Sequence, residues 1–499
     1  MANQSDRIDV NMLSNLNVLI ICDYHLPGSN ANALADHINS FQKHSQHNIF
    51  MLSSVGDLPA DFNLEAFDVL VIHYSIVVIG TSYLSESAKD RIANYKGLKV
   101  QYIQDEYREI NRFQIEMDRL GTDLLFTCVP QSLWKYTYPD HILPWLALRP
   151  TLTGYVPEAL LQHRVKPTAE RTTDVFYRGR QVPYWIGSAT LEKYQIAQEF
   201  ARLARGTELV IDLASEEGSR LYGDSWLQHL GNAKCTLGVE SAASLLDFTG
   251  GFQRRTEAYI RQHPMASFAE VEAAAFPGID NRFNTAQISP RCFEAAAMRT
   301  CMILYEGEYS GILEPGRHYL SLKKDFSNFN EICTIIRNSA RLQEISDCAY
   351  QEVALNPQYS NKRFVEEFET GVAEVMALKK HLPRRIDIEA IVEQFQTVYT
   401  DYRPEVGRLH GALYFRHSSN DEFFVSRAFV QYCARDIDLL ADSHKVVNVS
   451  PKPVRSHVHV FESIDQARPP IRRLLLSWWR RMPYSLRLKI EPLLLLIKR

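Results

Sequence analysis

Short apolar runs separated by segments of helix length are the feature that most limits what this chain can fold into. Leu16–Ile21, Phe67–Ile72 and Leu124–Cys128 are each mostly apolar. Strands of this kind are buried on both faces, as in parallel sheets that are covered by helices. Their alternation with helical segments predicts an α/β fold with right-handed crossovers.

Residues 1–148 form the first predicted unit of this kind. Two further strands are expected at Asn48–Leu52 and Leu98–Ile103. Helices are expected after a cap at Ser29 or Asn30, at Ser85–Tyr95 and at Ile110–Leu120, which is followed by Gly121. The unit is therefore predicted to be Rossmann-like, with strand and helix in alternation.

A Pro-punctuated linker at 149–172 leads to a second alternating unit at 173–380. Its expected strands are Asp174–Tyr177, Glu208–Ile211, Ala233–Val239 and Cys301–Leu304. Its expected helices are Ala189–Ala204, a segment around Trp226, Ile288–Arg299, Asn328–Asn338, Ser346–Leu355 and Lys362–Leu378. Residues 241–285 are irregular or helical. Two sequential parallel α/β units are thus predicted.

The C-terminal part adds an extension at 381–466, with a helix expected near Ile386–Tyr399, and a basic tail at 467–499. Residues 468–499 hold nine Lys/Arg and one acid, for a local charge of +8, among leucines and two tryptophans. Such a segment suits an anionic membrane surface. A docking helix on the protein itself or on a dimer mate is the alternative. We favour the membrane, because the cationic density exceeds what packing requires.

Composition excludes several other classes of protein. The formal net charge of −4 gives no global indication of nucleic acid as a partner. The eight cysteines show no C-x-x-C pair, and the N-terminus has no basic region followed by an apolar run. We therefore expect reduced thiols and a cytoplasmic location, with peripheral attachment to the inner membrane face through the tail.

Motif searches narrow the chemistry further. The chain has no G-x-G-x-x-G after its first strand, no P-loop and no G-x-S-x-G elbow. It also lacks H-E-x-x-H and EF-hand spacings, so no metal site is predicted. These absences argue against a nicotinamide oxidoreductase, a P-loop NTPase and an α/β-hydrolase.

The best-defined constellation of residues lies in the second unit. Residues 288–304 read ISPRCFEAAAMRTCMIL, with Ser289 at the N-cap and Pro290 at the first helical position. Together with YRGR at 177–180, this stretch resembles the C-terminal half of glycosyltransferases of the GT-B architecture. The resemblance implies two Rossmann-like parallel-sheet domains facing a cleft, and it covers roughly residues 170–350, with 15–140 similar at the level of pattern.

The same resemblance implies the donor-binding residues. Glu294 would hydrogen-bond the ribose hydroxyls of a sugar nucleotide, while Arg178 and Arg180 would neutralise its diphosphate. Arg291 would reach the same phosphate or pair with Glu294 one turn away. Lys193 is a weaker candidate for the lysine that assists in related enzymes.

Two details bear on the branch of the family. Many retaining members carry a Glu eight residues before the ribose-binding Glu, and here that position is Ala286. The stretches GVESAAS at 238–244, IHYS at 72–75 and IQDEYR at 103–108 are similar to a divergent bacterial branch, the spore-maturation-type glycosyltransferases.

Under the same resemblance the acceptor would bind the first unit. Open parallel sheets hold ligands outside the carboxyl ends of their strands. The polar residues at these ends are Asp23, His73, Asp105 and Glu106. We favour His73 and Asp105 as the catalytic pair. A core histidine and a helix cap are the structural alternatives for the two.

The predicted function is transfer of a sugar from a nucleoside-diphosphate sugar to a glycan or lipid-linked acceptor, in surface polysaccharide or glycoconjugate synthesis. No cofactor or metal is expected, because Arg and helix N-termini can carry the phosphate charge. The alternatives are a sugar-nucleotide epimerase of the same architecture and a non-catalytic scaffold that binds a nucleotide or a glycan.

Overall fold

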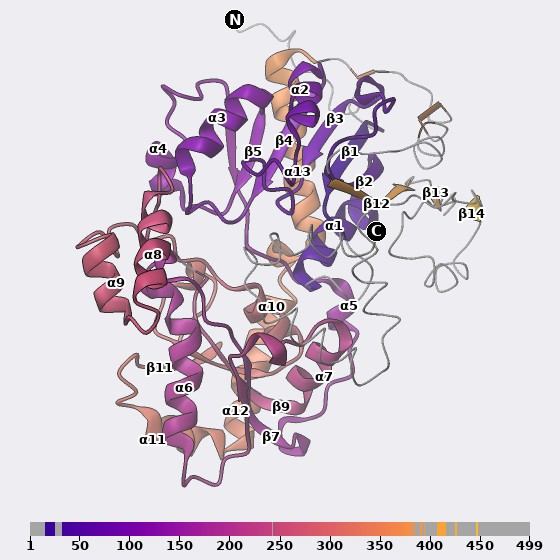
Figure 1. Ribbon diagram of the computed structural model, residues 1–499. Helices are drawn as coiled ribbons and strands as arrows, with labels where there is room; N and C mark the ends of the chain where they lie inside the picture. The colour runs from indigo at the N-terminus through magenta and orange to yellow at the C-terminus, as the bar shows by residue number, and fades with distance from the viewer. Residues whose placement is uncertain are drawn as a thin grey trace, which may run out of the picture.

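The computed structural model describes residues 15–24, 32–241 and 243–381, and short stretches at 383–384, 390–391, 394, 407–415, 425–426 and 446–447. Two lobes are stacked one above the other, each built around a mostly parallel sheet (Figure 1). The predicted fold class, α/β with two Rossmann-like units, is confirmed.

The first lobe contains a seven-stranded sheet of order β12-β2-β1-β3-β4-β5-β6. Its strands are β1 (Asn17–Cys22), β2 (Asn48–Gly56), β3 (Val69–Ile72), β4 (Leu98–Ile103), β5 (Leu124–Thr127), β6 (Ala147–Pro150) and β12 (Gly407–Phe415). All neighbours pair in parallel except β12, which runs antiparallel to β2 at the sheet edge. The five strands that the sequence predicted in this unit are present, and β6 and β12 are additional.

The apolar runs are buried as expected, because successive side chains of a strand point to opposite faces. Along β1, Leu19 and Ile21 enter the core beneath α2 (Glu86–Asn94) and α3 (Ile110–Leu120). Val18 and Ile20 enter the opposite core, which α1 (Asn32–His44) and α13 (Asn361–Lys379) cover. Short helices α4 (Trp134–Thr137) and α5 (Glu158–Leu161) complete this part of the chain.

The helix α13 corrects the predicted domain boundary at 380. The sequence assigned this helix to the second unit, but Phe364 and Phe368 lie in the core of the first lobe. The Phe364 ring stands 5.0 Å from that of Phe41 on α1, centroid to centroid. The chain therefore returns to the first lobe after completing the second, and Figure 1 shows α13 running along the first sheet.

The second lobe holds a five-stranded parallel sheet of order β11-β10-β9-β7-β8. Its strands are β7 (Thr173–Arg178), β8 (Ile211–Ala214), β9 (Ala233–Gly238), β10 (Cys301–Tyr305) and β11 (Tyr319–Leu322). The helices α7 (Gly223–Asn232) and α10 (Pro290–Ala297) cover one face. The helices α6 (Glu192–Ala204) and α11 (Phe329–Ile336) cover the other, and α12 (Ser339–Ala349) contributes to both cores.

An insertion between β9 and α10 carries α8 (Gly251–Gln262) and α9 (Phe268–Ala275) and fastens the second lobe to the first. The Asp247 amide donates to Tyr107 O at 2.8 Å, and the Asn111 amide donates to Phe248 O at 3.0 Å. Leu246 and Phe248 also pack with Ile110 at the start of α3. The lobes are thus joined on this side of the cleft as well as through the connecting segment at 151–157.

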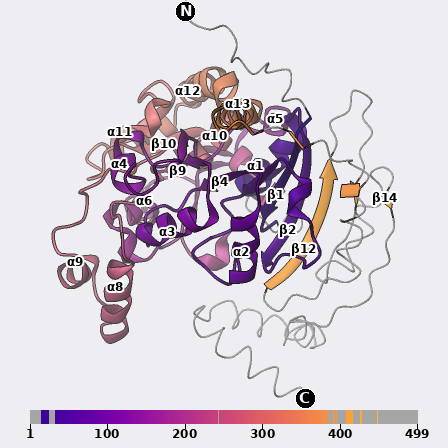
Figure 2. The same ribbon diagram turned by 90° about the horizontal axis from the view of Figure 1, so that it is seen from above.

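The extension at 381–466 supplies β12, which lies along β2 at the edge of the first sheet (Figure 2). It also supplies β13 (Val425–Ser426) and β14 (Val446–Val447), which pair with each other in parallel. Most of the helix expected near Ile386–Tyr399 and the whole tail at 467–499 lie outside the described residues. No helix among the described residues is long and apolar enough to span a bilayer.

Candidate functional site

A cavity of about 460 Å³ lies between the two lobes, within the range typical of small-molecule sites. The first lobe contributes the residues that follow β4 and β5, among them Asp105, Glu106 and Cys128. The second lobe contributes the ends of β7, β9 and β10, together with α10. The cavity therefore occupies the carboxyl-end position at which open parallel sheets bind ligands.

The N-terminus of α10 opens onto this cavity. Ser289 is the N-cap residue and Pro290 the first helical residue, as predicted, but the Ser289 side chain makes no capping hydrogen bond. Ser289, Pro290 and Cys292 all line the cavity. Gly154 of the connecting segment passes so close that an added Cβ would lie 2.9 Å from Pro290 Cβ, so this approach requires glycine. The positive end of the helix dipole is thus fixed at the cavity wall.

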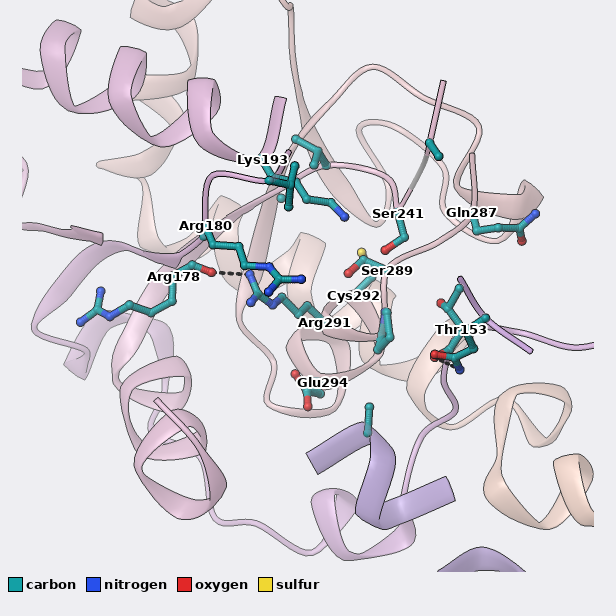
Figure 3. A pocket seen from close by; sticks show the side chains of 18 of the residues that line it. Thr153, Arg178, Arg180, Lys193, Ser241, Gln287, Ser289, Arg291, Cys292 and Glu294 are labelled. Atoms are coloured by element: carbon teal, nitrogen blue, oxygen red, sulfur yellow. Dashed lines mark hydrogen bonds between the residues drawn. The ribbon is translucent and has the colours of Figure 1, made fainter. Parts of the chain in front are cut away.

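Three cations from three different elements meet at the same wall: Arg180 after β7, Lys193 in α6 and Arg291 in α10 (Figure 3). Gly179 allows the chain to approach α6, because an added Cβ would lie 2.7 Å from Lys193 O. Burial lowers the pKa of Lys193 from 10.5 to about 8, and the charges of Arg291 and Arg180 add to this effect. Burial is the larger cause of the low pKa, and the contribution of the two arginines shows that their charges act on Lys193.

No carboxylate among the described residues lies within ion-pair distance of Arg180, Lys193 or Arg291. Asp105 of the opposite lobe partly offsets the lowered pKa of Lys193 from a greater distance. Like charges gathered without counter-charges destabilise the protein unless an anion binds among them. With the helix N-terminus beside them, these side chains form a site suited to phosphate groups.

Glu294 lies one turn further along α10 and faces the same cavity. The indole Nε1 of Trp226 donates to Glu294 Oε2 at 2.9 Å. Burial raises the pKa of Glu294 to about 7, although Trp226 and Arg291 oppose the rise. The guanidinium of Arg291 stands over the Trp226 ring at 5.1 Å. The Glu294 carboxylate is therefore held by the indole, and the close ion pair with Arg291 that the sequence left open is not formed.

The structure does not place the Arg178 side chain where a phosphate contact requires it. Its Nη2 pairs with Asp212 Oδ1 of β8 at 2.8 Å, and its guanidinium lies over the Phe176 ring. Figure 3 shows the side chain pointing away from Arg291, which reaches only the Arg178 carbonyl oxygen. We therefore no longer assign a phosphate contact to Arg178, because Asp212 already neutralises the charge of its side chain.

The structure also separates His73 from the cavity. The side chain is fully buried, with Nε2 at 3.0 Å from His37 Nδ1 and Nδ1 at 2.9 Å from Ser75 Oγ. Burial and the neighbouring His37 lower its pKa well below 6.5. His73 is thus a core histidine beneath α1, and both of its ring nitrogens have hydrogen-bond partners. We therefore no longer assign it a catalytic role.

Asp105 is the other residue that the sequence favoured in the first lobe. It lies in the turn after β4, is exposed and lines the cavity. Its charge acts on Lys193 across the cleft and on Tyr74 and Tyr107 in its own lobe. The structure therefore brings Asp105, Arg180, Arg291 and Glu294 to one cavity.

For other residues at or near the site, the sequence predicted only a weak role or none. Lys193 has no motif around it, and only the resemblance to glycosyltransferases indicated it, as a weaker candidate. Glu240 accepts the Tyr309 amide at 2.7 Å and so fixes the loop after β10. Ser241 and Gln287 line the cavity and exchange backbone hydrogen bonds. Across the described residues, no cluster of three or more His, Cys, Asp or Glu side chains could hold a metal ion.

No family model and no curated protein matches the chain. Among solved structures, an alpha-glucosyltransferase in complex with UDP and a 13-mer DNA is similar at 11% identity and TM-score 0.44, over 72% of this chain and 100% of its own. Anabaena Alr3699/HepE in complex with UDP is similar at 9% identity and TM-score 0.39, over 71% and 100%. TarM is similar at 10% identity and TM-score 0.35, over 61% and 54%. At such identities and TM-scores the likenesses fix no activity for this chain.

Proposed function

We propose that this protein is a glycosyltransferase that uses a nucleoside-diphosphate sugar as donor. The observation that carries the proposal is the group of Arg180, Lys193 and Arg291 at the N-terminus of α10, with no carboxylate of the described residues in ion-pair distance. Two phosphates carry the charge and the oxygen acceptors that such a group demands. A diphosphate leaving group would be stabilised at the same place as negative charge develops on it.

Glu294 gives the donor site its second feature. An ionised carboxylate can accept from two vicinal hydroxyls, such as those of a ribose, and Trp226 holds this carboxylate in place from one side. Glu294 follows Arg291 by three residues on α10, so that both project near the helix N-terminus. The phosphate and pentose parts of one nucleotide would thus contact neighbouring side chains of a single helix.

The first lobe would present the acceptor to the donor. Asp105 lies on that side of the cavity and would take the proton of an acceptor hydroxyl. A lipid-linked glycan or a surface polysaccharide remains the proposed acceptor, and attachment to an anionic membrane through residues 468–499 remains part of the proposal. A cytoplasmic location, the absence of a cofactor and of a nucleic-acid partner, and the spore-maturation-type branch likewise stay predictions.

One observation favours the epimerase alternative. Asp36 of α1 and Glu294 of α10 come from opposite lobes and interact electrostatically, and an epimerase needs acidic groups paired across the cleft. Burial raises the pKa of Asp36 to about 6. An epimerase would convert one nucleotide sugar into another without release of a nucleoside diphosphate, whereas a scaffold would bind the nucleotide and leave it intact.

Calorimetric titration with UDP, followed by an assay for UDP release from UDP-glucose, tests the proposal. UDP should bind and UDP-glucose should be hydrolysed slowly in the absence of an acceptor. Arg291→Met should weaken UDP binding by about 10- to 100-fold, the usual loss for a charged hydrogen-bond partner. Arg261→Met, on the exposed face of α8, is the matched control and should bind normally. Equal affinity in both variants would show that the cations do not bind the diphosphate.

A further inference from the structure

The helix that carries Lys193 begins without a cap of its own. Lys193 is the second residue of α6, and its side chain extends into the cavity (Figure 3). Leu191 occupies the N-cap position and makes no side-chain capping hydrogen bond, and the short 3₁₀ turn Ser188–Thr190 directly precedes it. The first amides of such a helix and of its lead-in turn need another partner. The place of Lys193 in the cavity wall therefore depends on what holds this turn.

Asp280, which lies 92 residues further along the chain in the insertion before α10, binds this turn. The Ser188 amide donates to both carboxylate oxygens of Asp280, at 3.3 Å each. Ser244 Oγ donates to Asp280 Oδ1 at 2.6 Å and accepts the Ala189 amide at 3.1 Å. The Leu191 amide donates to Ser188 O at 2.9 Å, which joins the turn to α6. Two successive amides are thus bound by one carboxylate and by the hydroxyl that it orients.

The turn approaches this carboxylate so closely that glycine is required just before it. Gly187 has a φ of +98°, in the region that favours glycine. A Cβ added there would lie 2.1 Å from Ser244 Oγ and 2.6 Å from Asp280 Oδ1. Because both distances are shorter than a van der Waals contact, any side chain at position 187 would push the turn away from Asp280.

Asp280 does not line the cavity, so it has no direct contact to offer a ligand there. Among the described residues, the charges that shift the pKa of Lys193 belong to Arg291, Arg180 and Asp105. Asp280 can therefore act on a ligand of the cavity through the backbone of the turn and of α6.

We propose that Asp280 is a positioning residue for donor binding, which keeps Lys193 aligned with the diphosphate by holding the turn before α6. A carboxylate is suited to this task, because its charge strengthens hydrogen bonds from backbone amides and is favourable near the start of a helix. A hydrogen bond between Lys193 Nζ and a phosphate oxygen weakens steeply when the helix start shifts by about 1 Å. The inference rests on the proposed function, since it concerns the same donor site.

A double-mutant cycle, measured by calorimetric titration with UDP, provides the test. Asp280→Ala should weaken UDP binding by about fivefold or more when Lys193 is present, and by less than about twofold in the Lys193→Met background. Asp280→Asn keeps an oxygen acceptor for the Ser188 amide and should retain the wild-type affinity within about threefold. A loss of equal size in both backgrounds would overturn the inference, because a merely structural aspartate would act independently of Lys193. Full affinity in Asp280→Ala would overturn it as well.

The controls separate the possible failures. Glu257→Ala removes an equal charge from an exposed position on α8 of the same insertion and should bind UDP like the wild type. Thermal melting checks that each variant is folded. Gly187→Ala disturbs the same contact from the side of the turn, and its loss of affinity should also require Lys193. A wild-type protein that binds no UDP would contradict the proposed function and the inference together, whereas additive losses in a protein that binds UDP would contradict the inference alone.

Discussion

Replacing Lys193 with methionine should make the free protein more stable while it weakens UDP binding. Lys193 is half-buried beside Arg291 and Arg180, and its pKa falls from 10.5 to about 8. Methionine keeps an apolar stem of similar length but removes the charge. One substitution should thus act on stability and on affinity in opposite directions, which a purely structural lysine would not do.

The expected size of the effect follows from the lowered pKa of Lys193. A fall from 10.5 to about 8 corresponds to roughly 3 kcal/mol of cost for keeping the lysine charged in the fold. Because the pKa is lowered, this cost applies in full below pH 8 and disappears as the pH rises toward 10.5. Lost contacts of the lysine stem offset part of the gain. We expect a net gain of about 1–2 kcal/mol at pH 7, or on the order of 2 °C in Tm.

Thermal unfolding at pH 7 and pH 10, with and without UDP, measures both effects. The Tm gain of Lys193→Met should be present at pH 7 and absent near pH 10. UDP at 100 times its Kd should stabilise the wild type by about 2.7 kcal/mol, and the variant by clearly less at the same concentration. Lys362→Met, which removes a surface lysine 67% exposed and 3.9 Å from Glu366, should change neither quantity. A Lys193→Met protein that melts earlier at pH 7 and responds fully to UDP would refute the reasoning.

Three further predictions concern the site and the core. UDP affinity should fall as the pH drops through about 7, where Glu294 becomes protonated, and Glu294→Gln should bind more weakly without this pH dependence in calorimetric titrations. Arg178→Met should leave UDP affinity within twofold but lower the urea midpoint, because Asp212 loses its partner; a large loss of affinity would restore Arg178 to the site. Stability should decline as the pH falls below 6.5, because burial lowers the pKa of His37 to about 3 and that of His73 also lies below its ordinary value; His37→Phe should flatten this decline in urea unfolding, and an unchanged slope would contradict it.

The sequence predicted the central strands well, because their apolar character records burial on both faces. β4 and α3 begin and end at the predicted residues, and β1 differs by one residue at each end. The lateral strands were harder to predict. β8 lies at Ile211–Ala214 and not at Glu208–Ile211, and all four of its residues are only half-buried. At the edge of a sheet the hydrophobic pattern is weak, so the boundaries shift.

The return of α13 and β12 to the first lobe could not be predicted from the local pattern of apolar residues. The spacing of apolar residues in α13 predicts a helix but does not say which sheet it covers, and Phe368 packs in the first lobe. The strand β12 likewise needs β2 to complete its backbone hydrogen bonds. Both are tertiary contacts with surfaces more than 200 residues away in the sequence.

The candidate site shows the same limit on a smaller scale. The sequence Arg178-Gly179-Arg180 at the end of β7 predicted phosphate contacts for both arginines. Which of them is available for a phosphate depends on the contacts that each side chain makes. Arg178 forms an ion pair with Asp212 on the neighbouring strand. Gly179 allows the backbone to pass close to Lys193, and Arg180 lies at the cavity. His73 and Glu106 both follow strands, so strand-end position could not show that burial beside His37 removes His73 from the cavity, whereas Glu106 lines it.

The central claim is that three cations and the N-terminus of α10 bind the diphosphate of a nucleotide. A crystal structure of the full chain with UDP tests it most directly. The account predicts phosphate oxygens within about 3.2 Å of nitrogen atoms of at least two among Arg180, Lys193 and Arg291, with the ribose at Glu294. A nucleotide bound elsewhere, or one whose phosphates contact none of these side chains, would contradict it.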